Sequence, residues 1–279
     1  MPTVSFVNMK GGVGKTTLAV NVADILNRRY GLSVLLVDLD PQFNATQCLY
    51  SGEDYIATMK AGGDTIVDIF RDSVAEDIDP VSGVVKKNQK DFKDVKPWVF
   101  RKGFNIIPGN LGIYRIDMGH GQGKELRLRR YLQEKSKDYD YVIIDTPPTP
   151  SHYMNAGLLA SDYYLVPVKP EPLSRVGIDL LTGVVQSVSE NHGHEIECAG
   201  VVVTIADRRT KVYSDAVDFL DTNAAWKGKR FSGVLPQRTG VAREQGNQML
   251  ILDTDVDAAA KTGLVAIVKE LLERTGYDV

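Results

Sequence analysis

The sequence is poor in cysteine and contains no long apolar run. Its 279 residues include only two cysteines. Cys48 and Cys198 are far apart, so they suggest neither a disulfide framework nor a metal-ligand spacing. No apolar run approaches the roughly 20 residues that a helix needs to cross a bilayer. Met1–Thr3 leads directly into a predicted strand, which argues against a signal peptide. We therefore expect a cytoplasmic protein with no transmembrane segment.

The sequence also lacks an excess of positive charge: 33 Lys and Arg face 36 Asp and Glu, for a formal net charge of −3. The charge is nevertheless uneven. Between Asp207 and Glu244, eight basic residues outnumber five acidic ones, a net charge of +3. Such a segment permits weak, salt-sensitive binding to nucleic acid. Charge alone favours the alternative, which is an ordinary solvated surface.

A glycine-rich segment lies between a predicted strand at Val4–Val7 and a predicted helix that begins near Leu18. Its residues are Lys10, Gly11, Gly12, Val13, Gly14, Lys15, Thr16 and Thr17. Strand, glycine-rich turn and helix form the setting of a phosphate-binding loop. Backbone N–H groups and the helix N-terminus then face an anion. Lys15 is placed to contact β- and γ-phosphates, and the Thr16 hydroxyl to bind Mg²⁺.

Two further predicted strands end in aspartate. The apolar run Val34–Asp38 is followed by Asp40, and a second apolar run ends at Asp145. Ligands of open α/β sheets bind beyond the carboxyl ends of the strands. We therefore predict that Asp38, Asp40 and Asp145 lie beside the phosphate loop, near Mg²⁺ and an attacking water. The alternative is that Asp38 and Asp40 only form and cap a turn, and that Asp145 merely ends a strand.

The octapeptide with Lys10 ahead of the glycines resembles the deviant Walker-A family of ATPases. That family includes ParA-type partition proteins, the cell-division protein MinD, the nitrogenase iron protein and the arsenite-pump ATPase. The resemblance implies ATP and Mg²⁺ as cofactors. It also implies that Lys10 reaches the partner's nucleotide across a homodimer formed in the ATP state. Catalytic roles fall to Lys10, Lys15 and Asp40, and metal binding to Thr16, Asp38 and Asp145.

Later segments extend the resemblance to nearly the whole chain. Glu171 corresponds to a family element near the nucleotide or the dimer interface, although a solvated turn carboxylate is the alternative. Pro236 corresponds to a proline that packs near adenine. Phe43 stands where family members usually have glycine, which bears on the loop shape and the hydrolysis rate. The resemblance also implies DNA contacts by Arg208, Arg209, Lys211, Lys227, Lys229, Arg230, Arg238 and Arg243.

These motifs predict an α/β fold with a doubly wound, mostly parallel twisted sheet and helices on both faces. We expect a single ATPase domain over residues 1–279, with a surface insertion at about 72–102. That insertion either binds a specific partner or is a tolerated excursion. The predicted C-terminal helix, at about 256–274, has an apolar face that we assign to the core.

The resemblance implies an ATP-hydrolysing switch of the ParA type. Its ATP-bound dimer would bind DNA non-specifically, associate with the nucleoid, and position a plasmid, a chromosome region or a protein cargo. A ParB-like protein or cargo adaptor would stimulate hydrolysis. The alternative is a MinD-like ATPase that cycles on membranes, but the C-terminal helix lacks the basic polar face of interfacial helices. A redox ATPase would need paired cluster cysteines, which this chain lacks.

Overall fold

A single mostly parallel sheet organises the computed structural model, which describes residues 1–71, 76–78, 85–87, 91–116, 123–171, 174–237, 248–254 and 258–277. Within these ranges the sheet has eight strands in the order β10-β9-β8-β1-β7-β2-β6-β5. Only β5 runs antiparallel to its neighbour. The strands are β1 (Thr3–Phe6), β2 (Val34–Asp38), β5 (Trp98–Arg101), β6 (Phe104–Ile107), β7 (Tyr141–Asp145), β8 (Tyr163–Val168), β9 (Glu197–Ala206) and β10 (Arg230–Pro236).

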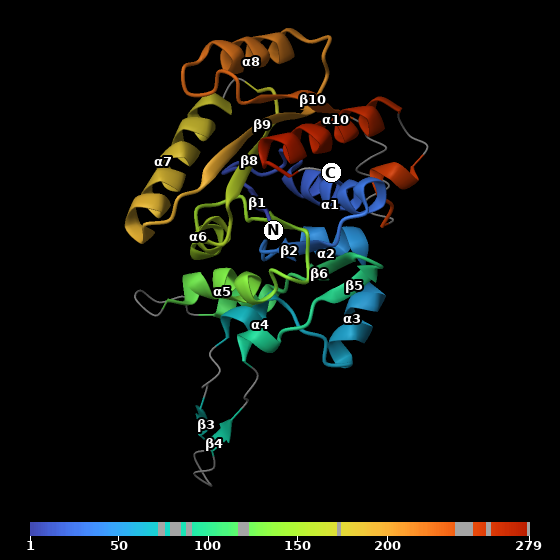
Figure 1. Ribbon diagram of the computed structural model, residues 1–279, viewed down its shortest axis with the longest axis vertical. Helices are drawn as coiled ribbons and strands as arrows, with labels where there is room; N and C mark the ends of the chain where they lie inside the picture. Colours follow the sequence, from blue (N-terminus) through green and yellow to red (C-terminus); the bar gives the residue numbers. More distant parts are fainter. Residues whose placement is uncertain are drawn as a thin grey trace.

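Helices cover both faces of this sheet. Figure 1 shows α1 and α10 on one side and α5, α6 and α7 on the other. The α-helices are α1 (Lys15–Tyr30), α2 (Asn44–Leu49), α3 (Gly52–Lys60), α4 (Ile66–Phe70), α5 (Arg127–Glu134), α6 (His152–Leu159), α7 (Ser174–His192), α8 (Lys211–Thr222) and α10 (Ala258–Arg274). Short 3₁₀ helices are η1 (Phe92–Asp94), η2 (Leu111–Arg115), η3 (Lys124–Leu126) and η4 (Ile251–Asp253).

The central strands are apolar because both of their faces are covered. Every residue of β2 is buried. Leu36 packs into the core cluster that includes α1 and α10, whereas Leu35 and Val37 pack into the cluster that includes α4 and α5. The continuous apolar run of a central strand therefore contributes side chains to two core layers, one on each side of the sheet. The predicted doubly wound fold is confirmed.

Most predicted elements form close to their expected bounds. The strand at Val34–Asp38 agrees in full, and the apolar stripe of the C-terminal helix, including Leu264 and Leu271, is buried as predicted. In α7, Leu181, Val185 and Val188 are buried and Leu180 is exposed.

The predicted insertion at 72–102 extends too far along the chain. Its last residues form β5, which pairs with β6 at the edge of the main sheet. This excursion contains a short hairpin of β3 (Glu76–Ile78) and β4 (Val85–Lys87), which pair antiparallel. Figure 1 shows this hairpin projecting away from the body below α4. The true excursion therefore lies between α4 and β5.

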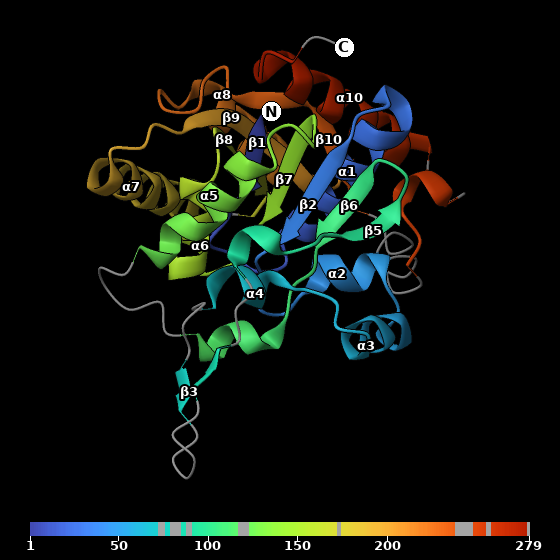
Figure 2. The ribbon, with the colours of Figure 1, turned by 60° about the horizontal axis from the view of Figure 1, so that its bottom comes forward.

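The carboxyl ends of β1, β2 and β7 lie side by side. Asp145 pairs in register with Phe6 of β1 and with Asp38 of β2. Figure 2 shows β2 pointing toward α2 and α4, which follow the loops at this edge. Parallel strands bring their ends to the same edge, so the polar residues after each strand meet there.

Candidate nucleotide-binding site

The phosphate loop connects β1 to α1 and has two glycines in the left-handed region. Gly12 has φ 72° and Gly14 has φ 76°, a conformation that glycine adopts without steric cost. The end of β9 supports this loop: Thr204 Oγ1 donates to Val13 O at 2.6 Å. Ile205 packs against Gly14, where an added Cβ would lie 3.4 Å from Ile205 Cγ1.

Lys15 and Thr16 at the start of α1 face Asp145. Lys15 is only 6% exposed. Its Nζ donates to Thr146 O and lies 3.6 Å from Asp145 Oδ1. Thr16 Oγ1 donates to Asp145 Oδ2 at 2.7 Å. The structure thus brings the phosphate-loop cation and hydroxyl onto the carboxylate at the end of β7, as the sequence predicts.

Asp38 and Asp145 form a buried carboxylate pair, and neither residue has measurable exposure. Thr46 fixes Asp38, because its backbone N and its Oγ1 donate to Asp38 Oδ2 at 2.8 and 2.7 Å. Burial, with the nearby Asp145 as the second cause, raises the pKa of Asp38 to about 8. Burial also raises the pKa of Asp145, against the lowering effect of Lys15.

These residues fit a magnesium ion. The Oδ1 atoms of Asp38 and Asp145 are buried and have no hydrogen-bond partner, so each has lone pairs available. Together with the Thr16 hydroxyl, they offer the hard oxygen ligands that Mg²⁺ prefers. Among the described residues, no group of three or more His, Cys, Asp or Glu could hold a metal. In protein Mg²⁺ sites, waters and substrate phosphates commonly complete the coordination.

A cavity of about 570 Å³ opens beside the phosphate loop. Asp40 lies in its wall, is 5% exposed, and accepts a hydrogen bond from Gln42 N at 2.9 Å. The wall is therefore formed by the phosphate loop on one side and the segment after β2 on the other. The lining residues are Lys10–Thr17, Asp40, Gln42, Asn44, Gln47, Cys48, Pro148 and Gln248.

Lys10 lies at this cavity and is paired within its own chain. Its Nζ donates to Glu171 Oε2, and Lys169 Nζ lies 2.6 Å from Glu171 Oε1. The bonds from Lys10 and then Lys169 lower the pKa of Glu171 to about 2, so Glu171 stays ionised at neutral pH. The two residues that the resemblance placed near the nucleotide are thus in contact with each other.

Pro236 lies apart from the phosphate cavity. It lines a second cavity of about 900 Å³, formed by the end of β9, by β10 and by α10. Arg208 and Arg209 also line this second cavity. The predicted adenine contact at Pro236 therefore stays a prediction.

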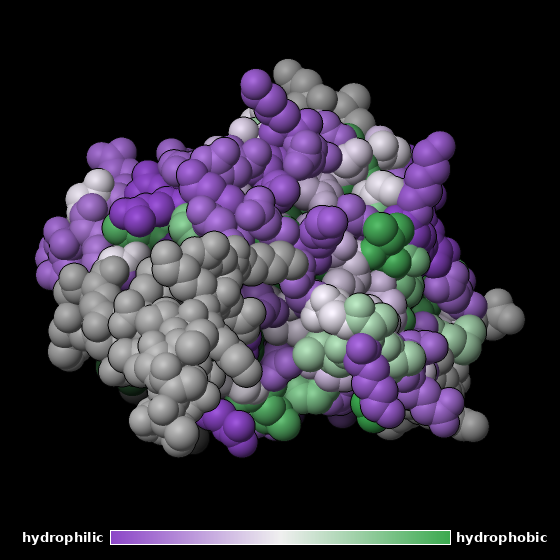
Figure 3. All heavy atoms as spheres, turned by 90° about the horizontal axis from the view of Figure 1, so that it is seen from below, coloured by the Kyte–Doolittle hydropathy of each residue, from purple (hydrophilic) through white to green (hydrophobic). Residues whose placement is uncertain are grey.

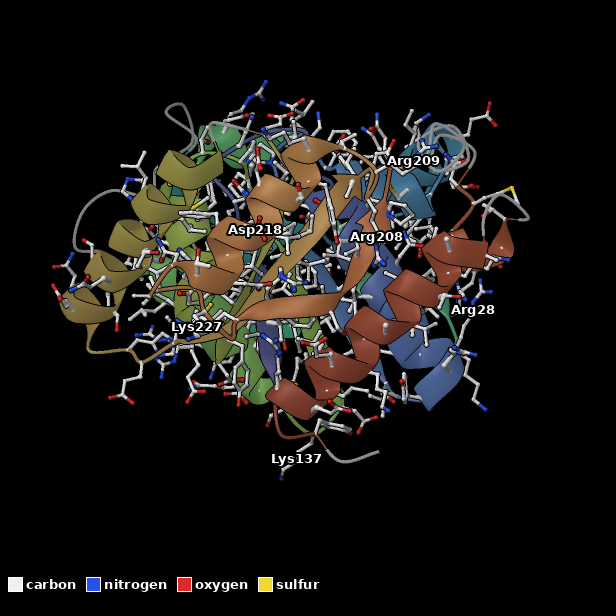
Figure 4. The ribbon with its side chains drawn as sticks, turned by 90° about the horizontal axis from the view of Figure 1, so that it is seen from above. Arg28, Lys137, Arg208, Arg209, Asp218 and Lys227 are labelled. Atoms are coloured by element: carbon white, nitrogen blue, oxygen red, sulfur yellow. The ribbon has the colours of Figure 1, made fainter. Side chains whose placement is uncertain are left out.

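The predicted DNA-contacting residues divide between two edges of the sheet. Arg208, Arg209 and Lys211 follow the carboxyl end of β9, whereas Lys227 and Lys229 precede β10. Figure 4 shows Lys227 well apart from Arg208 and Arg209. Some of these charges are already paired, because Arg209 and Arg230 contact Asp207 and Asp221 at 2.8 Å. Arg238 and Arg243 lie outside the described residues.

Several residues that shape the site were not predicted from the sequence. Thr46 orients Asp38, and Thr146 supplies the carbonyl that receives Lys15. Thr204 lies 191 positions from its partner Val13, so no local pattern could reveal that contact. Thr46 lies inside α2 and donates to Asp38, eight residues earlier, which is not a capping pattern that the sequence alone would reveal.

Sequence and structure comparisons agree with this geometry. A family model described as an AAA domain (AAA_31) matches residues 1–198. The cell division protein PomZ of Myxococcus xanthus is 28% identical over 272 residues, covering 96% of this chain and 77% of PomZ. The sporulation initiation inhibitor protein Soj of Bacillus subtilis is 27% identical over 256 residues, covering 90% of each.

A solved plasmid partition protein from Borrelia burgdorferi, described as putative and bound to AMPPNP, has the same fold. It superposes with a TM-score of 0.75 at 21% identity and covers 100% of both chains. The fold and the site define a P-loop nucleotide-binding protein with a deviant Walker-A loop. The chain belongs to the AAA domain family and, within it, to the ParA-type partition ATPases.

Proposed function

We propose that this ATPase hydrolyses ATP to ADP and phosphate by in-line attack of water. The observation that carries the proposal is the meeting of Lys15, Thr16 and Asp145 beside one cavity, with Asp40 in its wall. Lys15 and the loop N–H groups stabilise charge that develops on the phosphates. Asp40 orients the attacking water. Thr16, Asp38 and Asp145 would hold Mg²⁺, which would supply further charge stabilisation to the phosphates.

The chain then acts as a switch between monomer and dimer. The Lys10 side chain is 44% exposed and, within the part of the chain that the structure describes, its ion-pair partner is Glu171. A pair this exposed contributes little free energy, so little opposes its release. In the ATP state Lys10 contacts the terminal phosphate of the partner's nucleotide. Because hydrolysis removes that phosphate, it also removes the reason for the dimer to persist.

The dimer binds DNA without reading its sequence. Arg208, Arg209 and Lys211 lie at the same edge of the sheet as the nucleotide cavity, and a dimer doubles their number. Two linked basic surfaces bind a polyanion more tightly than one. A ParB-like or cargo-adaptor protein stimulates hydrolysis, and the cycle positions a plasmid, chromosome region or protein cargo on the nucleoid.

Membrane cycling of the MinD kind has less support. In the described part of the chain, no helix is both long and apolar enough to cross a bilayer. Figure 3 shows a face that is mainly hydrophilic where it is coloured, with small separate hydrophobic areas. The apolar stripe of α10, including Leu264 and Leu271, is buried in the core, so it is not available as an interfacial anchor.

The Asp40→Ala variant tests the hydrolytic role directly. We expect it to bind a fluorescent ATP analogue as the wild type does and to lose at least about 50-fold in turnover, because the water is no longer oriented. Full turnover by Asp40→Ala would reject the role of Asp40.

The Lys10→Ala variant tests the switch. It should keep binding nucleotide but lose ATP-dependent dimerisation in light scattering. Unchanged dimerisation of Lys10→Ala would reject the cross-subunit contact.

A further inference from the structure

Phe43 adopts an unusual backbone conformation beside Asp40. Its φ is 43° and its ψ is 39°, a left-handed conformation that a bulky residue rarely adopts unless its surroundings hold it there. Phe43 N donates to Asp40 O at 2.7 Å, and Gln42 N donates to Asp40 Oδ1 at 2.9 Å. The conformation at Phe43 therefore closes the short turn that aims the Asp40 carboxylate.

The ring of Phe43 is held outside the nucleotide cavity. Its neighbours Gln42 and Asn44 line that cavity, whereas Phe43 does not. The ring instead stacks on Tyr55 of α3, with centroids 5.4 Å apart and planes inclined by 18°. The Tyr55 ring also lies 5.5 Å from the ring of Trp98 on β5. An aromatic contact to a neighbouring helix thus anchors the turn that carries Asp40.

Gly109, which follows β6, contacts both Tyr55 and Thr46. Tyr55 OH donates to Gly109 O at 3.1 Å, and Gly109 N donates to Thr46 Oγ1 at 2.9 Å. An added Cβ on Gly109 would lie 2.6 Å from Phe43 Cβ and 3.0 Å from Asp38 Cγ. Because residue 109 is a glycine, the turn at Phe43 and the metal-binding Asp38 can both pack closely against the end of β6.

We propose that Phe43 and Tyr55 are positioning residues for ATP hydrolysis. The stacked rings keep Phe43 in the left-handed conformation, and that conformation fixes Asp40 at the cavity. This inference rests on the proposed function, because it acts through Asp40. A different element, the loop of residues 10–17, holds the phosphates, so disturbing the stack lowers the rate of the chemical step and leaves nucleotide binding intact.

The Tyr55→Leu variant tests this proposal by steady-state ATPase kinetics. We expect kcat to fall about 10-fold, because small displacements of a catalytic group are costly. The KM for ATP should stay within about 2-fold, the pattern of an interaction made only in the transition state. Tyr55→Phe keeps the ring and should recover most of the lost kcat. If Tyr55→Leu does not fold, Phe43→Leu removes the other ring and should show the same loss.

Testing Tyr55→Leu in the Phe43→Gly background distinguishes a positioning role of Tyr55 from a general structural role. Glycine adopts the left-handed conformation without a ring to hold it. In the Phe43→Gly background, adding Tyr55→Leu should therefore change kcat by less than about 2-fold relative to Phe43→Gly alone. Such non-additivity is expected only if the two residues act through one conformation. An equal loss in both backgrounds would overturn the proposal.

Tyr277→Leu is the matched control. Tyr277 is also a partly buried tyrosine in an aromatic pair, 5.9 Å from the ring of Tyr141, which begins β7 at the opposite end from Asp145. The kcat of Tyr277→Leu should match that of the wild type. A Tyr55→Leu kcat within 2-fold of wild type, together with a stalled Asp40→Ala, overturns the positioning role alone. Full turnover by Asp40→Ala overturns the proposed function itself.

Discussion

Single residues at the metal site link nucleotide chemistry to stability. Asp38 is fully buried beside Asp145, and the pKa of Asp38 is raised to about 8. In the unfolded chain an aspartate has a pKa near 3.9. Between about pH 4 and pH 8 the folded protein therefore keeps a proton that the unfolded chain has released. Because the folded state binds more protons there, the free energy of unfolding falls as the pH rises through that interval.

The Asp38→Asn variant should remove this pH dependence. Asparagine can still accept the hydrogen bonds from Thr46 but cannot ionise. Without nucleotide and Mg²⁺, we expect its melting temperature to match the wild type near pH 4 and to exceed it increasingly as the pH rises, by about 3 °C or more at pH 8.5. Thermal unfolding followed by circular dichroism with a chelator measures this difference. The same substitution at exposed Asp138 is the control, and an Asp38→Asn gain that is equal at both pH values would contradict the prediction.

Single elements support the site from outside their own motif, and the end of β9 is the clearest case. Thr204 Oγ1 donates to Val13 O at 2.6 Å. The next residue, Ile205, has φ 50°, which is strained for a β-branched side chain and occurs where Ile205 packs on Gly14. The carbonyl side of the phosphate loop is thus held by a strand nearly 200 residues later in the sequence.

Thr204→Val should therefore weaken nucleotide binding. It removes one buried hydrogen bond and keeps the shape, so we expect a stability loss of about 1 kcal/mol. Affinity for a fluorescent ATP analogue should fall about 5-fold, because the loop is less well ordered before binding. Thr275→Val is the matched control: Thr275 is buried, and its hydroxyl bonds to Leu271 O in α10. A similar stability loss is expected there, without a change in affinity. Equal affinities for the two variants would exclude a role of β9 in loop order.

The helices and strands also show how much of the structure could be predicted from the sequence. Residues whose chemistry is local, such as Lys15, Thr16 and Asp145, lie where their motifs indicate. Short helices were missed at α2 and α3, since segments of six and nine residues carry little periodic signal. The strand β5 was also missed, because it follows a long charged excursion and joins the sheet edge antiparallel.

Contacts between distant segments could not be predicted either. The sequence indicates that Phe43 replaces a glycine, but only the structure shows its left-handed conformation and its stack on Tyr55. Lys10 and Glu171 were each predicted to lie near the nucleotide, yet their mutual contact depends on how β1 and β8 pair. These features arise from packing in three dimensions, which a one-dimensional motif does not specify.

At the scale of the whole molecule, the edges of the sheet separate the basic residues into two groups. Arg208, Arg209 and Lys211 lie at the carboxyl edge with the nucleotide cavity, and Lys227 lies at the opposite edge. If ATP controls DNA binding through the dimer, the group nearest the nucleotide must carry most of the contact. A surface far from the cavity responds to ATP only through the doubling that dimerisation brings, whereas the group beside the cavity is also close to the bound nucleotide.

This separation leads to a prediction for DNA binding. With ATP, the protein should co-sediment with DNA and not with liposomes, and binding should fall steeply between about 50 and 200 mM salt as phosphate contacts are lost. Arg208→Ala combined with Arg209→Ala should reduce ATP-dependent binding at least about 10-fold and lower the salt slope by about 1 per lost phosphate contact. Lys227→Ala with Lys229→Ala, the matched pair at the amino edge, should change it less than about 3-fold. Equal losses from both pairs would mean that DNA lies across the whole sheet and not along the nucleotide edge, and binding that ignores ATP would remove the switch.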